Sequence, residues 1–386
     1  MLPTPTGSYP VGRSFLDVVD ATREDPYSRR RHVPRVLPVT LWYPAEKAAA
    51  SRQPGAYLPG AWRCVSWLWG LGARRTGTHA VDGAVPVDGL LPLVVLSPAA
   101  NPALCHTAIA EELASHGYVV AGISHPYESM PVTAYADRWP RLTRLKSLGG
   151  ALSAPGSRPY AVDLAERAAV VAVKADDIAA VALHLMGAEP RGGRAMPLVD
   201  RWGAIGHSFG GGAVAEVCRR PATTCCAGVN LDGGLWTTPE HAGVAVPFLQ
   251  LFAEHPEYVT TAADDQATPP DPTDYAVVDR ATTVGAWQSL HESATPGYAA
   301  IVTGATHTSF SDWPLLPLRR WSPARRAVAG VDGPAVWSAT TTALRAFLDR
   351  HVGGGPTDVG AALVDDSRLR TGAPVSLFST QPAAVA

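Results

Sequence analysis

The chain has 386 residues, of which 46% are hydrophobic and 17% charged, and its formal net charge is -2. This composition supports a sizeable core and excludes wholesale disorder, while the length suits one large α/β domain as well as two smaller ones. The small net charge, with no long run of lysine or arginine, gives no reason to expect nucleic acid or an acidic membrane surface as a partner.

The first part of the chain alternates short apolar runs with segments of helical period. This order is typical of a mostly parallel sheet with helices on both faces. The run at 36–43 alternates apolar and polar residues and predicts a half-exposed strand near a sheet edge, whereas the later runs are continuously apolar and predict buried strands. The predicted elements are strands at 14–20, 36–43, 91–96 and 118–123, and a helix at 104–116 that Gly117 can end.

Residues 125–160 are rich in proline, glycine, arginine and serine and have no sustained period. They predict a lid-like insertion. A helix is predicted next, at 161–186, and it is the longest apolar stretch of the sequence. It carries too many charged residues to cross a bilayer, so we expect no transmembrane segment.

The second half continues the same alternation of strands and helices. The predicted elements are strands at 202–205, 226–231, 245–252 and 298–303, and helices at 210–218, 275–290 and 338–352. The sequence that follows begins with three glycines and a proline, which predicts a loosely packed tail at 353–386. We therefore expect a single α/β domain at 1–352, followed by this tail.

The cysteines and the N-terminal segment bear on compartment and cofactors. Five cysteines are an odd number, and they lack the CxxC spacing of a zinc site or redox pair, so we expect most of them to be reduced and buried. No cluster of histidine, aspartate or cysteine has metal-ligand spacing, and we expect neither a metal nor another cofactor. The first residues have no basic and apolar regions of a secretory signal, which predicts a cytoplasmic protein.

The sequence GHSFG at 206–210 has the form G-x-S-x-G and lies between a predicted strand and a predicted helix. In the α/β-hydrolase fold this motif forms a sharp turn that needs small residues, so that the serine hydroxyl stands clear of the sheet. An ordinary tight turn is the alternative, but the strand and helix favour Ser208 as a nucleophile. The N–H of Phe209, at the start of the helix, is then a predicted donor to the oxyanion of acyl transfer.

A second oxyanion donor should come from the loop after the strand at 91–96. This loop has the sequence SPAANP and lacks the His-Gly pair that many esterases carry here. Ala100 is the best candidate for the N–H, and Ala99 is the next. An ordinary proline-containing loop explains the same residues about equally well.

A serine hydroxyl needs a histidine to accept its proton, and in this fold the order along the chain is serine, acid, histidine. His307 follows the last predicted strand, where a loop at the carboxyl end of the sheet would return it to Ser208. His241 and His255 lie in predicted turns and His291 ends a predicted helix, so we expect these three to be solvated. His307 is therefore the predicted base.

Two carboxylates compete to orient this histidine. Asp232 directly follows the strand at 226–231, and two glycines after it leave room for an imidazole. Glu254 follows the next strand, at 245–252. Both positions lie at the carboxyl edge of the predicted sheet, so spacing alone does not decide between them.

Four stretches of the chain, taken in order, resemble one known family. They are LVVLS at 93–97 with LASHGYVV at 113–120, GHSFGG at 206–211, NLDG at 230–233 with Trp236, and HTSF at 307–310. The family is that of the platelet-activating-factor acetylhydrolases, serine esterases, in its bacterial branch. GHSFGG alone is shared with many lipases and polyester hydrolases, whereas the order of all four stretches is more specific. The resemblance covers most of residues 8–352.

The resemblance implies Ser208 as nucleophile, His307 as base and Asp232, rather than Glu254, as acid. It also implies that no metal is needed. The chain departs from the family at Pro98-Ala99, where a His-Gly pair is common, and this affects the predicted second oxyanion donor. Members of the family cleave short or oxidised acyl chains of phospholipids, simple esters and, in related branches, polyesters. The implied substrate is a small-molecule or lipid ester.

Tryptophans near the predicted catalytic loops suggest an acyl pocket. Trp236 and Trp313 are candidates for lining it, with filling of the core as the alternative. The leading hypothesis is a serine carboxylic-ester hydrolase that works through an acyl-enzyme. An acyltransferase or a cutinase-like polyester hydrolase with the same three residues is the alternative. A catalytically silent hydrolase fold used for binding is a hypothesis of another class, and the complete serine, acid and histidine set disfavours it.

Overall fold

The apolar runs form one large sheet. The structure is a computed structural model and describes residues 2–59, 76–128, 132–133, 141–142, 156–187, 198–221, 223–259 and 274–379. Within these residues the sheet has ten strands. From one edge to the other they are β12 (Leu369–Thr371), β11 (Gly297–Val302), β10 (Phe248–Phe252), β9 (Cys225–Leu231), β8 (Leu198–His207), β4 (Leu91–Ser97), β5 (Val119–Ile123), β2 (Pro34–Pro44), β1 (Val11–Glu24) and β3 (Val81–Asp82).

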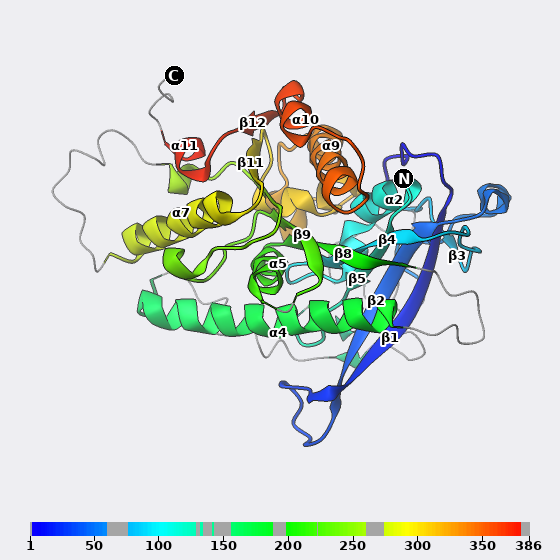
Figure 1. Cartoon of the computed structure of the whole chain (residues 1–386), viewed down its shortest axis with the longest axis horizontal. Helices are drawn as coiled ribbons and strands as arrows, with labels where there is room; N and C mark the ends of the chain where they lie inside the picture. The colour runs from blue at the N-terminus through cyan, green and yellow to red at the C-terminus, as the bar shows by residue number, and fades with distance from the viewer. Residues whose placement is uncertain are drawn as a thin grey trace.

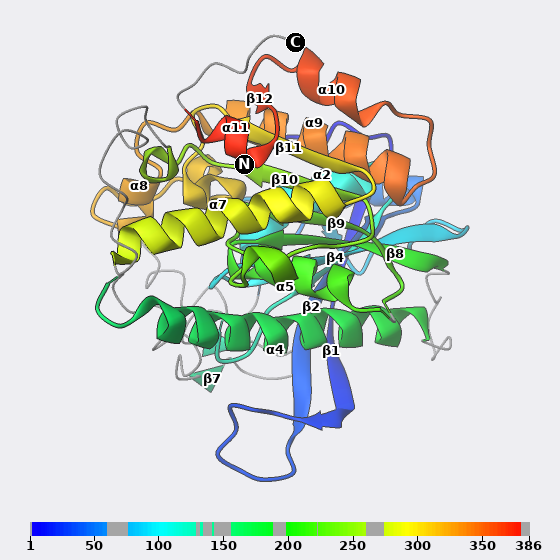
Figure 2. The ribbon, with the colours of Figure 1, turned by 60° about the vertical axis from the view of Figure 1, so that its left-hand side comes forward.

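The strands from β11 to β5 pair in parallel. Strand β12 is antiparallel to β11, β2 is antiparallel to β5 and to β1, and β1 pairs in parallel with β3. Helices cover both faces of this sheet (Figures 1 and 2). On one face lie α4 (Tyr160–Met186), α5 (Phe209–Arg219), α7 (Tyr275–Ser293) and α11 (Pro374–Leu377). On the other lie α2 (Thr107–Ser115), α9 (Gly333–His351) and α10 (Val359–Asp365). The order confirms the predicted α/β-hydrolase architecture.

Each face of the sheet has its own apolar core. In β4 the side chains of Val94 and Leu96 belong to the core under α2 and α9, while Leu93 and Val95 belong to the core under α4 and α5. Successive side chains of a strand point to opposite faces, so a strand that is covered on both sides must be apolar throughout. This explains the continuous apolar runs of the sequence.

Strand β2 differs from its prediction. The alternation at 36–43 predicted a half-exposed strand, but β2 lies between β5 and β1 and is almost wholly buried, including Thr40 at 5% exposure. Trp42 reaches the core under α2, and Leu41 reaches the core on the opposite face. The half-exposed prediction is wrong because α2 covers the face that the polar residues suggested was open.

The C-terminal segment also differs from its prediction. Leu363 of α10 and Leu369 of β12 join one core, and Leu377 and Phe378 join the other. Strand β12 extends the sheet by pairing with β11. The expected tail at 353–386 is therefore wrong as far as the described residues reach, because apolar side chains after the glycines return the chain to the sheet.

Part of the sequence prediction lies outside the described residues. This holds for most of the insertion at 125–160, of which the two short strands β6 (Val132–Thr133) and β7 (Arg141–Leu142) are described. In the part of the chain that the structure describes, no helix has the length and apolar character needed to cross a membrane.

The sheet gathers the candidate site residues at one edge. Strands β8, β9, β10 and β11 are parallel neighbours, so the loops that follow them emerge together at their carboxyl ends. Short 3-10 helices follow in three of these connections: η5 (Pro239–His241), η6 (Pro256–Tyr258) and η7 (His307–Phe310). Ligand sites of open α/β sheets lie at this edge.

Candidate active site

Ser208 occupies the turn between β8 and α5. Its backbone angles, φ 57° and ψ -122°, are rare for a residue with a side chain, and such strain is typical of a nucleophile elbow. Two glycines allow the turn. A Cβ at Gly206 would overlap the carbonyl group of Gly210, and a Cβ at Gly210 would overlap the carbonyl oxygen of Ser97. Strand, helix and the loop after β4 therefore pack too closely for side chains at these positions.

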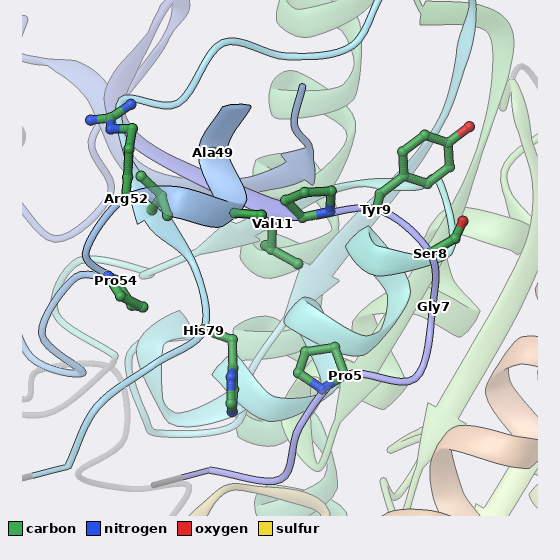
Figure 3. Close-up of a pocket in the computed structure, with 12 residues that line it drawn as sticks. Pro5, Gly7, Ser8, Tyr9, Val11, Ala49, Arg52, Pro54 and His79 are labelled. Atoms are coloured by element: carbon green, nitrogen blue, oxygen red, sulfur yellow. The ribbon is translucent and has the colours of Figure 1, made fainter. Parts of the chain in front are cut away.

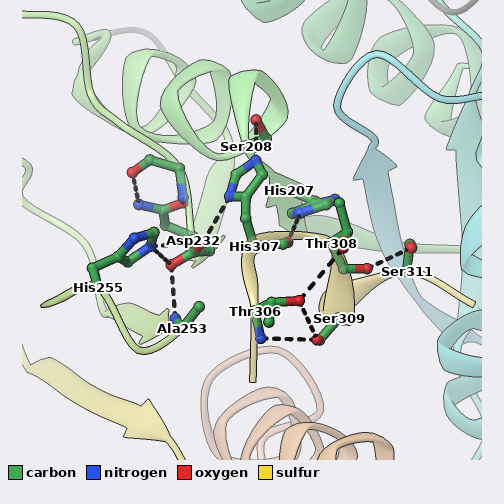
Figure 4. A network of polar contacts seen from close by, with 12 residues as sticks. His207, Ser208, Asp232, Ala253, His255, Thr306, His307, Thr308, Ser309 and Ser311 are labelled. Atoms are coloured by element: carbon green, nitrogen blue, oxygen red, sulfur yellow. Dashed lines mark hydrogen bonds and ion pairs between the residues drawn. The ribbon is translucent and has the colours of Figure 1, made fainter. Parts of the chain in front are cut away.

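The predicted base reaches this serine. His307 Nε2 lies 3.0 Å from Ser208 Oγ, as Figure 4 shows. The loop that carries His307 is held by a capping box, in which the backbone and side chains of Thr306 and Ser309 bond to each other. His207 Nε2 donates to the backbone carbonyl of His307 at 2.8 Å. These contacts fix the direction from which the imidazole approaches Ser208.

His207 is a residue whose part the motif did not reveal. Burial, together with the neighbouring His307 and His106 rings, holds the pKa of His207 well below its usual range, so the ring is neutral. With its Nε2 proton given to the His307 carbonyl, its Nδ1 accepts from His106 Nε2 at 3.3 Å. The histidine of the Gly-His-Ser sequence thus connects the elbow to the loop of the base.

Asp232 completes the chain of contacts. Its Oδ2 accepts from His307 Nδ1 at 2.7 Å, and its Oδ1 accepts from the backbone N–H of Ala253 at 2.7 Å. Burial would raise the pKa of Asp232, but the hydrogen bonds from His255 and His307 outweigh it and hold the pKa well below its usual range. Asn230 supports the turn, because its side chain bonds to both backbone groups of Gly233. The carboxylate is therefore buried, ionised and fixed.

The structure separates the two candidate acids. Glu254 is exposed, whereas Asp232 is 4% exposed and contacts His307.

The predicted solvation of His255 is wrong, because its side chain is only 15% exposed and its Nε2 lies 2.9 and 3.0 Å from the two oxygens of Asp232. Nothing in the sequence marks His255 except its position one residue after Glu254, at the end of the neighbouring strand. His241, by contrast, is exposed as expected.

The predicted oxyanion donors lie on the two segments that meet at Ser208. Phe209 is the first residue of α5, where the backbone N–H groups have no partner within the helix. Ala100 lies in the loop after β4, which Gly210 touches through the carbonyls of Ser97 and Pro98. This loop is thus in place beside the elbow. Ala100 as second donor stays a prediction.

A buried lysine orients that loop. Lys174 of α4 lies with its Nζ 3.3 Å from the carbonyl oxygen of Pro98 and 3.4 Å from that of Ala99. In a trans peptide the N–H points away from the preceding carbonyl oxygen. The contacts therefore turn the N–H groups of Ala99 and Ala100 away from Lys174. Glu128 compensates the lysine charge at 3.3 Å.

A second Ser-His-Asp chain lies beneath the loop. Ser97 Oγ lies 2.9 Å from His125 Nε2, and His125 Nδ1 lies 2.9 Å from Asp177 Oδ2. All three residues are fully buried, and Arg35 binds Asp177 at 2.7 Å. Burial and the charge of nearby Lys174 lower the pKa of His125 to about 3, so it is neutral. A substrate cannot reach this serine, whereas the His307 side chain beside Ser208 is 46% exposed.

The two candidate pocket tryptophans do not lie together. Trp236 stacks on Phe209 with ring centroids 4.2 Å apart and an interplanar angle of 15°, next to the elbow. It packs against the core under α4 and α5, while Trp313 packs against the core on the opposite face. Trp236 is half-buried and is the better placed of the two for contact with an acyl group.

Two further features of the structure resemble binding sites. The ligand atoms of Asp232, His255 and His307 lie within 4.8 Å of one another, a spacing at which such groups can also bind a metal ion. Each atom already makes a hydrogen bond of 2.7 to 3.0 Å within the group, so these hydrogen bonds account for the cluster.

The second feature is a hollow of about 300 Å³ beside the N-terminal segment, lined by residues that include Tyr9, Arg52 and His79 (Figure 3). It contains none of the predicted site residues.

Comparison with known proteins adds to this geometry. No family model matches the chain. A probable 1-alkyl-2-acetylglycerophosphocholine esterase from Arthroderma benhamiae is 24% identical over 347 residues, which are 82% of this chain and 77% of the relative. A solved ferulic acid esterase from Streptomyces cinnamoneus has 27% sequence identity and a TM-score of 0.69, over 93% of this chain and 94% of that chain. The chain is an esterase of the α/β-hydrolase fold.

The names of these two matching proteins refer to different acyl groups. One is named for an acetyl ester of a glycerophosphocholine and the other for ferulic acid. The first agrees with the resemblance to platelet-activating-factor acetylhydrolases that the four sequence stretches carry, and this resemblance is confirmed. Both comparisons extend over most of the esterase, so they concern the same domain as the site around Ser208.

Proposed function

We propose that this esterase is a serine carboxylic-ester hydrolase in which Ser208 is the nucleophile, His307 the general base and Asp232 the acid. The observation that carries the proposal is the continuous contact from Ser208 Oγ through the imidazole to a buried carboxylate, at 3.0 and 2.7 Å. Three residues from three separate loops meet in the arrangement that acyl transfer needs.

The protonation states follow from the contacts. An ionised Asp232 can only accept, so His307 Nδ1 carries the proton and its Nε2 presents a lone pair to Ser208 Oγ. As Oγ attacks the ester carbonyl, Nε2 takes the hydroxyl proton, and it then gives that proton to the leaving alkoxide. Water repeats the sequence on the acyl-enzyme and releases the acid, which regenerates Ser208.

The oxyanion of each tetrahedral intermediate needs donors fixed before the reaction. We assign the N–H of Phe209 as the first donor and that of Ala100 as the second. The rigid start of α5 and the contacts of Lys174 with the neighbouring carbonyls support this assignment. Both peptide groups belong to segments held by packing, which lowers the cost of reorganisation during catalysis.

For the substrate we propose a short-chain or lipid-like ester. The acetyl group in the name of one relative and the half-buried Trp236 beside the elbow support this class. Initial rates on p-nitrophenyl esters of graded acyl length, then on a 2-acetyl phospholipid and on methyl ferulate, test it. We expect C2 to C4 esters to be cleaved faster than C16. Faster turnover of the C16 ester contradicts the proposal.

Covalent labelling tests the nucleophile. An organophosphonate should label the wild-type protein at Ser208, because an activated hydroxyl beside an oxyanion hole traps a tetrahedral phosphorus adduct. Ser208→Ala should abolish both labelling and ester hydrolysis. Ser97→Ala is the matched control, since Ser97 has similar histidine and aspartate partners but is buried, and it should leave the label on Ser208. Hydrolysis at the wild-type rate by Ser208→Ala would overturn the proposal.

A further inference from the structure

The Asp232 carboxylate has a second histidine on its outer side. Asp232 directly follows β9 and His255 follows the neighbouring strand β10, so the parallel pairing of the two strands brings them together. His255 Nε2 lies 2.9 Å from Oδ1 and 3.0 Å from Oδ2, while His307 Nδ1 lies 2.7 Å from Oδ2 (Figure 4). One carboxylate therefore connects two imidazoles, and only His307 faces Ser208.

The contacts of His255 indicate that it is a cation. Its other nitrogen, Nδ1, lies 2.8 Å from Glu257 Oε1, so both ring nitrogens face carboxylate oxygens that can only accept. Burial lowers the pKa of His255, but the hydrogen bonds and charges of Asp232 and Glu257 outweigh this and raise the pKa to about 9. At neutral pH, Asp232 thus lies between an imidazolium and the imidazole of His307.

The other groups around His255 and Asp232 do not change the charges of these two residues. The exposed Glu254 precedes His255 in the chain, and the ring of Tyr258 from η6 lies edge-on to His255 with centroids 5.4 Å apart. Beyond Tyr258 lie Asp279 of α7, at 3.5 Å from the phenol, and Arg167 of α4, whose charge acts on both. Burial raises the pKa of Tyr258, so the phenol stays neutral. Facing His307 from β8 is His207, which is also neutral.

The charge of His255 acts on the neighbouring imidazole at short range. The atoms involved lie within 4.8 Å of each other. A positive charge at this separation disfavours a second one by roughly 0.6 pH units at the dielectric constant of water and roughly 2.5 units at a dielectric constant of 20. His307 is 46% exposed, which places the effect toward the lower figure. The acid limb of the activity profile should therefore depend on the charge of His255.

We propose that His255 is a positioning residue that extends the activity of this esterase into mildly acidic solution, because its charge offsets that of Asp232 and keeps His307 a free base. This inference rests on the proposed function. A lone ionised Asp232 would stabilise the protonated form of His307 and stop catalysis at a higher pH. With His255 beside it, Asp232 still orients the base, but its field at His307 is partly cancelled.

The test is the pH profile of kcat/KM for p-nitrophenyl acetate between pH 4 and 9. His255→Gln keeps a neutral donor for Asp232 and loses the charge. We expect the acid limb of the profile to move about one unit toward higher pH, with the plateau value within a few-fold of wild type. His241→Gln is the matched control, because His241 lies exposed beside Glu240, away from Asp232, and its profile should coincide with that of wild type.

An unmoved acid limb in His255→Gln would overturn the inference, and so would a plateau loss without a shift, because that result indicates support of the fold alone. If His255→Gln does not fold, a nitrogen NMR titration of the wild-type protein decides instead. The His255 ring should keep both protons above pH 8, and a ring that is neutral at pH 7 would refute the inference. Organophosphonate labelling of Ser208 in wild type separates these outcomes from failure of the proposed function.

Discussion

Replacing Asp232 by asparagine keeps the shape of the side chain, reverses the polarity of its contact with His307 and removes the negative charge that His255 contacts. The backbone φ of 55° at this position is one that asparagine adopts readily, so the turn after β9 should persist. The N–H of Ala253 points at Oδ1, which fixes the amide oxygen of the new side chain at that position. Its NH₂ group then takes the place of Oδ2, opposite His307 Nδ1.

Two donors now face each other, so the imidazole must move its proton to Nε2 to avoid the clash. This tautomer presents an N–H to Ser208 and cannot accept the hydroxyl proton. For the same substitution in a serine protease kcat falls by about 10⁴-fold. This fall corresponds to an activation free energy that is higher by about 5.5 kcal/mol. We expect Asp232→Asn to lose kcat on this scale while KM changes little.

Steady-state hydrolysis of p-nitrophenyl acetate measures the loss, and thermal unfolding of the same sample checks the fold. Glu254→Gln is the matched control, because Glu254 follows the neighbouring strand and is exposed. It should retain near wild-type kcat. A large loss in Glu254→Gln together with a near-normal Asp232→Asn would move the acid to the loop after β10 and refute the assignment.

Three further predictions concern packing and stability. Gly210→Ala should lower stability by about 1–3 kcal/mol and kcat at least tenfold, because the new methyl group overlaps the Ser97 carbonyl; an unchanged melting temperature would contradict this. The free energy of unfolding should fall between pH 6.5 and about 9, by on the order of 3 kcal/mol, because folded His255 holds a proton that the unfolded chain loses first. Urea titrations measure this fall, which His255→Gln should largely remove. Deleting 353–386 should prevent folding, since it removes β12 and exposes both cores; a soluble, active truncation would disprove it.

Local signals in the sequence were enough to predict the fold class, which is confirmed, and to single out Ser208 as the candidate nucleophile. Continuous apolar runs mark strands covered on both faces, and the Gly-His-Ser-Phe-Gly sequence between a strand and a helix marks the turn at Ser208. The position of His307 after the last long strand also followed from chain order. The structure brings Ser208 and His307 into contact. Such positions can be predicted because sheet burial, backbone strain and the order of elements are reflected in patterns of a few residues.

Tertiary structure decided the rest of the site. Asp232 and Glu254 are equivalent in sequence position, and only the packed loops show that one carboxylate is buried against His307 while the other faces solvent. His255, placed in a turn by the sequence, meets Asp232 because β9 and β10 are neighbours in register.

The sequence alone predicted an esterase and the positions along the chain of the candidate reacting groups. Only the tertiary structure decided which charged groups are buried together, as for Lys174 beneath the loop after β4. It also decided that the C-terminal residues pair with β11 and extend the sheet. The physical reason is that burial and charge interactions depend on distances in space. Those distances are set by strand order and register, which no local pattern of residues encodes.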